Sequence, residues 1–308
     1  MNPSHTSDDD FATPAQPAVE ASRLSALAAD RRLALGWLSA GGLALSMPLV
    51  LAGCGGGGGG GGDSASGSTA SDSGSSSSDS GSGGSSTSSG TCPSTEIASE
   101  TGGPYPADGS NTSNGSTVDV LSLSGILRSD IRSNVGESTL LTGLPLTLTL
   151  TVVNLNNACA AIEGAAVYIW HCDKDGEYSA YNTSANGDHV GETYLRGVQL
   201  TDANGQVSFT TVYPGWYAGR ITHIHAEVYL DGNYASGTPD KTTQFAFPQS
   251  VTTEVYASSL YVAHGQNTSV TSFSADNVFS DGTDTEMLTL SGDTSSGYAA
   301  TLTLGLDV

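Results

Sequence analysis

A run of eight consecutive glycines, Gly55–Gly62, is the feature that most limits how this 308-residue chain can fold. The residues that follow, 63–90, are only Ser, Gly, Asp, Thr and Ala. Such a segment cannot bury enough apolar surface to offset the conformational entropy that folding removes. We therefore expect residues 54–91 to form a flexible tether, and a folded domain to begin at Cys92.

The segment before the glycines has the pattern of an export signal. Arg31-Arg32 precede an apolar run that extends from Leu33 to Leu51. A membrane-spanning helix is the alternative, because a run of this length can cross a bilayer. Gly41-Gly42 and Pro48 interrupt the run, which disfavours a permanent span. Twin arginines in this position are typical of a Tat signal.

The apolar run ends in Leu51-Ala52-Gly53-Cys54, which resembles a lipobox. In that motif the cysteine is acylated and everything before it is removed. We predict that residues 1–53 form a cleaved signal and that Cys54 carries the lipid. The mature protein is then exported and anchored at the cell envelope, at the outer membrane or the cell surface.

The charge of the chain excludes several kinds of partner. Nine Lys and Arg stand against 31 Asp and Glu, which gives a formal net charge of −22. A nucleic-acid-binding surface needs Lys and Arg to neutralise phosphates. A negative protein also gains nothing at an anionic lipid surface. We expect no nucleic-acid partner, and membrane contact only through the lipid.

Residues 92–308 show the periodicity of strands and almost none of helices. Apolar and polar residues alternate in 146–152, 207–211, 224–228 and 302–306, and turn signals such as Asn204-Gly205 separate the runs. Alternation places every second side chain on the same face of a sheet. We predict one all-β domain, a β-sandwich of mainly antiparallel strands with long loops.

Three cysteines follow the tether. They are Cys92, Cys159 and Cys172. An exported protein meets an oxidising compartment, so at least one disulfide is expected. Cys159 and Cys172 flank one apolar strand and are the preferred pair, with Cys92–Cys159 as the second choice.

The candidate metal-binding residues of the chain cluster around His223-Ile224-His225. In a strand the two imidazoles share one face, where they form half of a metal site. Two surface histidines on an edge strand are the alternative. Tyr217 and Arg220 lie just upstream, and a phenol becomes a ligand when a strongly acidic metal such as Fe(III) displaces its proton. Tyr178, after a second strand, is either a further candidate ligand or an ordinary aromatic residue of a loop.

His189 and His264 have no motif around them and are expected at the surface.

At this point the motifs resemble those of a known family, the intradiol ring-cleavage dioxygenases, and in particular its secreted single-domain branch. The similarity extends from about Cys92 to the C-terminus. The segments that carry it are Thr101–Tyr105, Arg128–Arg132, Gly164–Tyr181, Gly205–His225 with Tyr-Pro-Gly-Trp-Tyr and Arg-Ile-Thr-His-Ile-His, Thr243–Phe247 and Gly297-Tyr298.

The resemblance implies a non-haem Fe(III) site in the long loops. Its four ligands would be Tyr178, Tyr217, His223 and His225. Tyr217 would also accept a substrate proton.

The resemblance assigns three further residues. Arg220 would bind the substrate and stabilise negative charge that develops on its ring. Gln244 would be a catalytic residue behind the iron ligands, on the side where oxygen reacts, and Tyr105 would line the entrance for the substrate.

The implied activity is cleavage of a catechol by O₂ to a muconate-type dicarboxylic acid. The alternatives are a catalytically silent β-sandwich that only binds, and a structural surface lipoprotein.

Overall fold

The computed structural model of the chain describes residues 92–308. The expectations for residues 1–91, namely the cleaved signal, the lipid on Cys54 and the tether, lie outside the described residues. None of the helices within 92–308 has the length and apolar character needed to cross a membrane.

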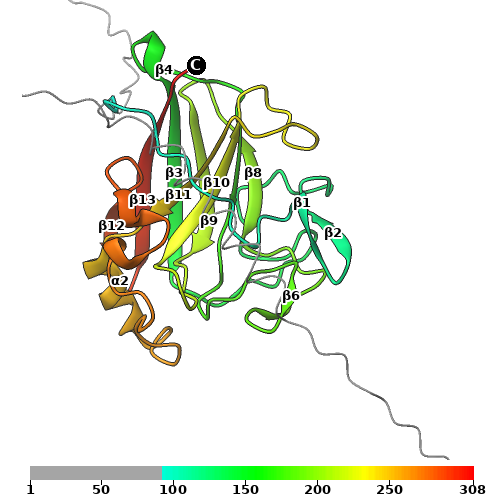
Figure 1. Ribbon diagram of the computed structural model, residues 1–308, viewed down its shortest axis with the longest axis vertical. Helices are drawn as coiled ribbons and strands as arrows, with labels where there is room; N and C mark the ends of the chain where they lie inside the picture. The colour runs from blue at the N-terminus through cyan, green and yellow to red at the C-terminus, as the bar shows by residue number, and fades with distance from the viewer. Residues whose placement is uncertain (1–91) are drawn as a thin grey trace, which may run out of the picture. The chain divides into compact units, whose positions relative to one another are not determined.

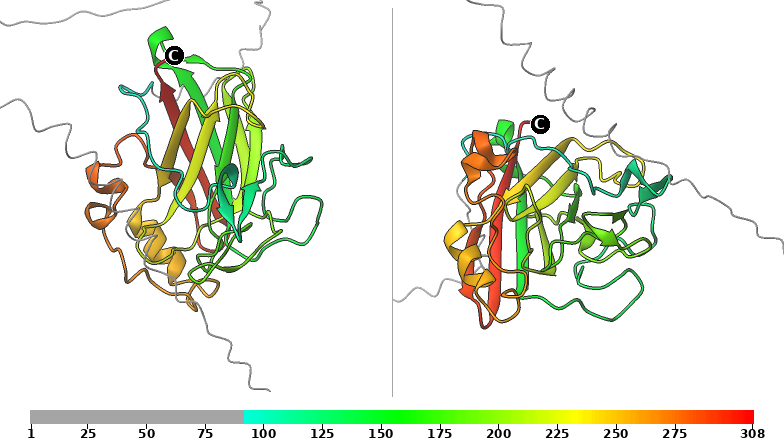
Figure 2. Two further views of the ribbon diagram at one scale, coloured as in Figure 1. Left: turned by 45° about the vertical axis from the view of Figure 1, so that its right-hand side comes forward. Right: turned by 60° about the horizontal axis from the view of Figure 1, so that its bottom comes forward.

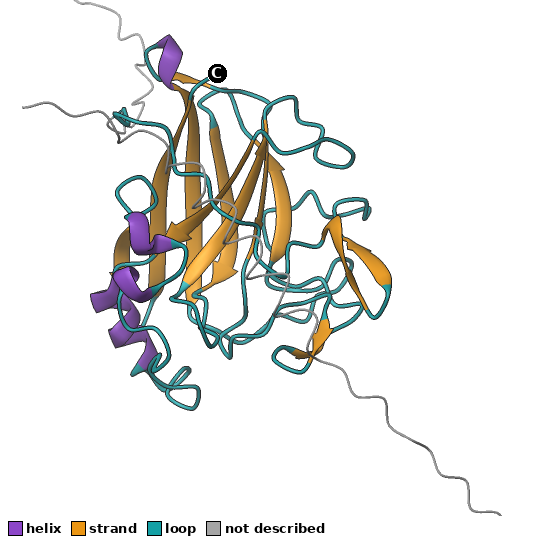
Figure 3. Ribbon diagram, viewed as in Figure 1, coloured by secondary structure: helices purple, strands orange, loops and turns teal. Residues whose placement is uncertain are grey.

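Strands account for most of the regular structure in the described residues (Figure 3). The strands are β1 (Asp108–Ser113), β2 (Ser116–Asp119), β3 (Pro145–Asn154), β4 (Ala160–Ala161), β5 (Ala166–Trp170), β6 (Asn182–Thr183), β7 (Gly187–Asp188), β8 (Arg196–Leu200), β9 (Gln206–Val212), β10 (His223–Tyr229), β11 (Lys241–Ala246), β12 (Thr289–Asp293) and β13 (Gly297–Leu306). The helical elements are α2 (Gln249–Tyr256) and the 3₁₀ turns η1 (Leu155–Asn157), η2 (Phe273–Ala275) and η3 (Phe279–Asp281).

Two sheets pack face to face and confirm the predicted all-β sandwich (Figures 1 and 2). One sheet has the order β11-β10-β5-β8. The other has the order β12-β13-β3-β4, with β9 also paired to β3. All pairs are antiparallel except β13 with β3, which run parallel. The strands beyond these two sheets form the small hairpins β1-β2 and β6-β7.

The core between the sheets follows from the alternation in β3. Leu146, Leu148 and Leu150 point inward and are almost fully buried. They share one apolar cluster with Ile224 and Ala226 of β10, which point toward them from the opposite sheet. Burying each large apolar side chain contributes about 1.5–3 kcal/mol. Because Ile224 is held in this core, the residues on either side of it must face the other way.

The outer face of the four-stranded sheet is therefore the face that carries His223 and His225. Trp170 and Tyr168 of β5 lie on the same face, because β5 pairs with β10 so that Trp170 stands opposite His225. Loops between residues 105 and 126 and around residues 178–181 cover this face and build a second buried cluster. The outer face is thus largely covered by these segments rather than solvated.

Helix α2 was not predicted from the sequence. It follows β11 directly and buries Val255 and Tyr256 at its end. The Tyr256 hydroxyl lies 2.5 Å from Thr222 Oγ1 and donates to the carbonyl of Pro214. Helix α2, η2 and η3 pack along the side of the sandwich (Figure 3). The turns η2 and η3 flank Asp276, which forms an ion pair with Arg220.

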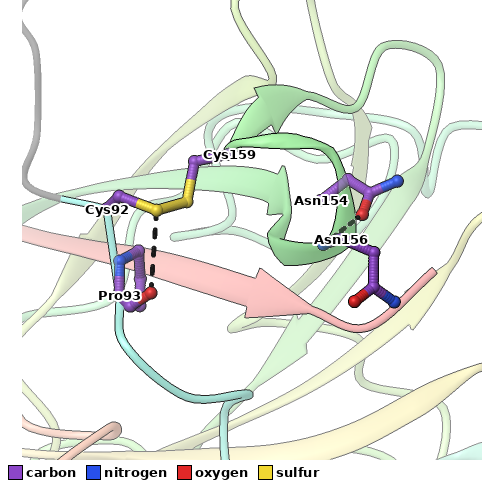
Figure 4. The surroundings of a disulfide bond; sticks show 5 residues. All are labelled: Cys92, Pro93, Asn154, Asn156 and Cys159. Atoms are coloured by element: carbon purple, nitrogen blue, oxygen red, sulfur yellow. Dashed lines mark hydrogen bonds between the residues drawn. A yellow bond between two sulfur atoms is a disulfide. The ribbon is translucent and has the colours of Figure 1, made fainter.

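The preferred disulfide was wrong, because Cys159 is bonded to Cys92 (Figure 4). Cys172 is free and buried. A disulfide needs Cα atoms about 4.4–6.8 Å apart, and those of Cys92 and Cys159 are 5.8 Å apart. Cys159 and Cys172 lie beyond opposite ends of β5, which spans about 17 Å at ~3.3 Å per residue. The second choice made from the sequence is the observed bond.

A buried carboxyl, Glu227, lies on the outer face below the histidines. Its Oε2 accepts a 2.8 Å hydrogen bond from the Tyr229 hydroxyl. Burial, together with the nearby carboxyl of Asp108, raises the pKa of Glu227 to about 8. The folded protein therefore holds a proton on Glu227 that the unfolded chain has released by neutral pH.

This pKa predicts a pH-dependent stability. The contribution of Glu227 is fully present below pH 4.5 and is lost as the pH rises through about 8. Glu227→Gln is neutral at every pH, so its unfolding free energy should rise relative to wild type between pH 5 and pH 8.5, by a few kcal/mol. Urea unfolding at pH 5 and at pH 8.5 measures the unfolding free energy of each protein. Glu163→Gln, at an exposed position, is the control. A constant difference between wild type and Glu227→Gln at the two pH values contradicts the prediction.

Candidate active site

The site begins where the chain enters β10. Pro214 and Gly215 follow the end of β9, and a loop then leads into His223. The Nε2 atoms of His223 and His225 lie 3.0 Å apart, with both rings buried. The sequence prediction of one shared face is confirmed, whereas the alternative of two surface histidines is not.

The two imidazoles are neutral and offer nitrogen lone pairs. His223 Nδ1 donates to the carbonyl of Ile221 at 2.6 Å, which leaves Nε2 unprotonated. Burial, followed by the charge of Arg220, lowers the pKa of His223 to about 3. Burial also lowers the pKa of His225 far below its usual value. Neutral imidazole is the form that binds metal ions.

Tyr178 reaches the same point from the end of β5. A tight turn carries it there: Asp173 Oδ1 accepts from the backbone N–H groups of Asp175 and Glu177, each at 2.9 Å. The Tyr178 hydroxyl lies 3.4 Å from His223 Nε2. The order of the strands explains this meeting, because the end of β5 lies beside the start of β10 in an antiparallel pair.

Tyr217 completes the group from the loop before β10. Its ring centroid is 5.7 Å from that of Tyr178 and 5.7 Å from that of His223. Tyr217 is half-buried, whereas Tyr178 is fully buried. The structure thus brings together all four residues that the sequence proposed as ligands.

Burial keeps both phenols protonated in the protein alone. It raises the pKa of Tyr178 well above 10 and that of Tyr217 to about 12, although the charge of Arg220 opposes the shift at Tyr217. Only a strongly acidic cation can displace such protons. Within residues 92–308, no group of three or more His, Cys, Asp or Glu side chains could hold a metal. Two imidazoles and two phenols form a different donor set, and it fits a hard trivalent ion.

Arg220 and Gln244 also lie beside this group. Arg220 Nη1 is 3.5 Å from His223 Nε2, and Nη2 donates to Gln244 Oε1 at 2.7 Å. Gln244 in turn donates to the carbonyl of Thr101 at 2.7 Å. Sequence analysis missed Asp276, whose carboxylate accepts from Arg220 Nε at 3.0 Å. Asp276 lies in a loop without a recognisable motif, so no local signal could have identified it.

The segment Gly102–Tyr105 crosses directly over the histidines. Gly103 has φ +69°, and a Cβ on it would lie 3.0 Å from Cε1 of His225. The Tyr105 ring packs at 5.0 Å from that of Tyr178, and its hydroxyl lies 3.1 Å from Thr183 Oγ1. Tyr105 is half-buried beside the cluster.

Two buried side chains beneath the site were not singled out from the sequence. The indole of Trp170 stacks on His225, with ring centroids 4.8 Å apart and planes within 3°. The guanidinium of Arg196 is buried and donates to Ser179 Oγ, to the Ser179 carbonyl and to the Pro106 carbonyl. Arg196 therefore links Ser179, which follows Tyr178, to Pro106, which follows Tyr105.

Two further histidines support the loops that carry the tyrosines. His189 Nε2 lies 3.1 Å from Glu177 Oε2, next to Tyr178. His264 Nε2 donates to the carbonyl of Trp216, next to Tyr217, at 2.7 Å. Both histidines are half-buried, so the expectation of simple surface residues was wrong. The sequence gives no local signal for these two contacts, because each contact joins residues that are distant in sequence or that lie in irregular loops.

Comparison with known proteins agrees with this geometry. Residues 129–238 match the protein-family model described as Dioxygenase. An intradiol ring-cleavage dioxygenase from Tetranychus urticae is 27% identical, with a TM-score of 0.50, over 60% of this chain and 88% of that chain. The described domain is similar to the intradiol ring-cleavage dioxygenases. Proteins of this family generally depend on non-haem Fe(III).

Two further solved structures are similar to this chain. The dioxygenase domain of a dioxygenase carbohydrate-binding protein fusion from Streptomyces sp. SirexAA-E is 23% identical, with a TM-score of 0.43, over 70% of this chain and 99% of that chain. Catechol 1,2-dioxygenase from Acinetobacter sp. ADP1 is 19% identical, with a TM-score of 0.35, over 58% of this chain and 57% of that chain. No curated protein sequence matches the chain at a significant level.

The contact of Gly103 with His225 yields a prediction about metal affinity. Gly103→Ala places a methyl group against the His225 ring and strains a backbone that only glycine adopts freely. Displacing a ligand in this way should weaken metal binding about 10–100-fold. Iron content after reconstitution at graded Fe(III) concentrations measures the effect.

Gly102→Ala is the matched control, because its Cβ would meet only ordinary contacts at 3.7 and 3.9 Å. Equal iron affinity in the two variants contradicts the role given to Gly103.

Proposed function

We propose that the protein is an Fe(III)-dependent dioxygenase that uses O₂ to cleave the ring of a catechol between its two hydroxylated carbons, giving a muconate-type dicarboxylic acid. The observation that carries the proposal is the convergence of two neutral imidazoles and two phenols beside a buried guanidinium. A binding module or a structural protein has no need for this donor set.

The iron would be held by Tyr178, Tyr217, His223 and His225. Bound there, Fe(III) would supply a Lewis acid for the catechol. A hard cation also lowers the pKa of its phenol ligands, which removes the protons that burial would otherwise retain on the tyrosines.

The chain's own residues then have distinct tasks. Tyr217 is the more exposed of the two phenols, so its oxygen is the one that can accept a proton from an incoming catechol hydroxyl. Arg220 supplies a fixed positive charge beside His223 for the negative charge that develops on the ring. Gln244 holds one nitrogen of that guanidinium in place.

The walls of the site favour a planar substrate without a further charge. Tyr105 presents an aromatic surface, and the nearest cation, Arg220, is already paired with Asp276. The net charge of −22 also disfavours anionic substrates at long range. We therefore propose a neutral catechol as substrate, with O₂ as the second reactant.

We also propose that the enzyme acts outside the cytoplasm. The twin-arginine segment, the lipobox-like sequence ending at Cys54 and the Gly/Ser tether support export, lipid anchoring and a free catalytic domain at the cell envelope. The Cys92–Cys159 disulfide agrees with this, because such bonds persist in oxidising compartments. The domain boundaries proposed are 1–53 for the signal, 54–91 for the anchor and tether, and 92–308 for the catalytic domain.

Removing one ligand tests the proposal. His225→Ala should abolish iron binding and turnover. Tyr217→Phe removes only a hydroxyl and should lower turnover of catechol about 10²–10⁴-fold, because a ligand and a proton acceptor are both lost. Iron content and product formation per chain are measured for each variant.

Tyr213→Phe is the matched control, since Tyr213 is a buried tyrosine of the sandwich core that bonds to Thr252 and faces away from the site. Turnover that persists in His225→Ala without iron would contradict the proposed function.

A further inference from the structure

Asp276 lies between η2 and η3, far along the chain from the strands that carry the ligands. It is fully buried, a state that a carboxylate tolerates only when its oxygens are paired. The segment lies beyond residues 129–238, the part of the chain that matches the dioxygenase family model. The position is therefore a feature of this chain that the family match does not cover.

Both oxygens of the Asp276 carboxylate contact Arg220 Nε, and each also accepts from different backbone N–H groups. Oδ2 accepts from Arg220 Nε at 3.0 Å and from the backbone N–H of Ile221 at 2.7 Å. Oδ1 accepts from the backbone N–H groups of Val278 and Phe279 at 2.9 and 3.2 Å, and lies 3.2 Å from Arg220 Nε. One carboxylate thus ties its own loop to both the side chain and the backbone at the entrance to β10.

These contacts fix the plane of the Arg220 guanidinium. Nε is held by Asp276, and Nη2 is held by Gln244 at 2.7 Å. The ring of Phe279 lies 5.7 Å from the guanidinium carbon. With two edges held and one face covered, Nη1 is left directed at His223 Nε2, 3.5 Å away.

We propose that Asp276 is a positioning residue that aims Arg220 at the reacting ring. This inference rests on the proposed function and deepens it. A guanidinium held in advance by a buried carboxylate needs no reorganisation when negative charge develops, which is the condition for electrostatic stabilisation of a transition state. Without Asp276, Arg220 would be a buried charge with only neutral partners, free to turn toward solvent.

The competing explanation is that Asp276 only caps the turn at η3 through Val278 and Phe279. Asp276→Asn separates the two roles. It keeps the shape and one oxygen acceptor for the turn, but it removes the charge that holds Arg220. Asp202→Asn is the control, because Asp202 accepts from the backbone of Asn204 and Gln206 in a turn and pairs with no cation among residues 92–308.

The first measurement is kinetic, on the iron-loaded full chain. Asp276→Asn should lower kcat for catechol about tenfold or more. KM, iron content and the visible tyrosinate absorption should stay near the wild-type values, because the four ligands are untouched. Asp202→Asn should match wild type throughout. Unchanged kcat per iron, or a change confined to KM, overturns the proposal.

The second measurement does not depend on turnover. In iron-free protein, the Nε–H of Arg220 should give a slowly exchanging NMR resonance, assigned by its loss in Arg220→Lys. Asp276→Asn should abolish the protection of this proton. A resonance that stays protected in Asp276→Asn overturns the positioning role. A wild-type protein without catechol turnover contradicts the proposed function instead, and the resonance still decides whether Asp276 holds Arg220.

If Asp276→Asn does not fold, Asp276→Glu takes its place. It keeps the charge but moves the carboxylate by one methylene, so we expect an Arg220 resonance that is shifted but still protected, and a smaller loss of kcat. Wild-type kcat together with an unshifted resonance would count against the proposal.

Discussion

The antiparallel pairing of β10 with β5 is the constraint on which the rest of the structure depends. It places His225 opposite Trp170, and it brings the end of one strand to the start of the other. Because Ile224 is committed to the core between the sheets, both histidines must turn to the outer face. The turn after β5 then delivers Tyr178, and the loop before β10 delivers Tyr217. One register thus assembles groups from four separate places in the chain.

Burial gives this assembly its chemical character. It lowers the pKa values of the histidines and raises those of the tyrosines, so all four side chains are neutral in the protein alone. A neutral set of donors with no carboxylate among them favours a cation acidic enough to ionise phenols. The same low-dielectric surroundings strengthen the field of Arg220 at the site. Its charge is balanced by Asp276, so the buried pair is tolerated.

Much of this could be predicted from the sequence, and the failures have a common cause. The period of two in His223-Ile224-His225 fixed the face of both imidazoles, and the motifs around Tyr178 and Tyr217 marked the other donors. The disulfide partner of Cys159 and the role of Asp276 could not be derived in the same way. Both depend on the path of long loops across the sandwich, which no local periodicity encodes.

The visible absorption of the purified full chain, before and after catechol is added without air, tests the central claim most directly. The account predicts a wine-red protein whose band shifts when catechol binds, and then bleaches as O₂ is admitted and ring-opened product forms. A protein that stays colourless after Fe(III) is supplied would contradict it. That result would mean that Tyr178 and Tyr217 do not bind a common iron.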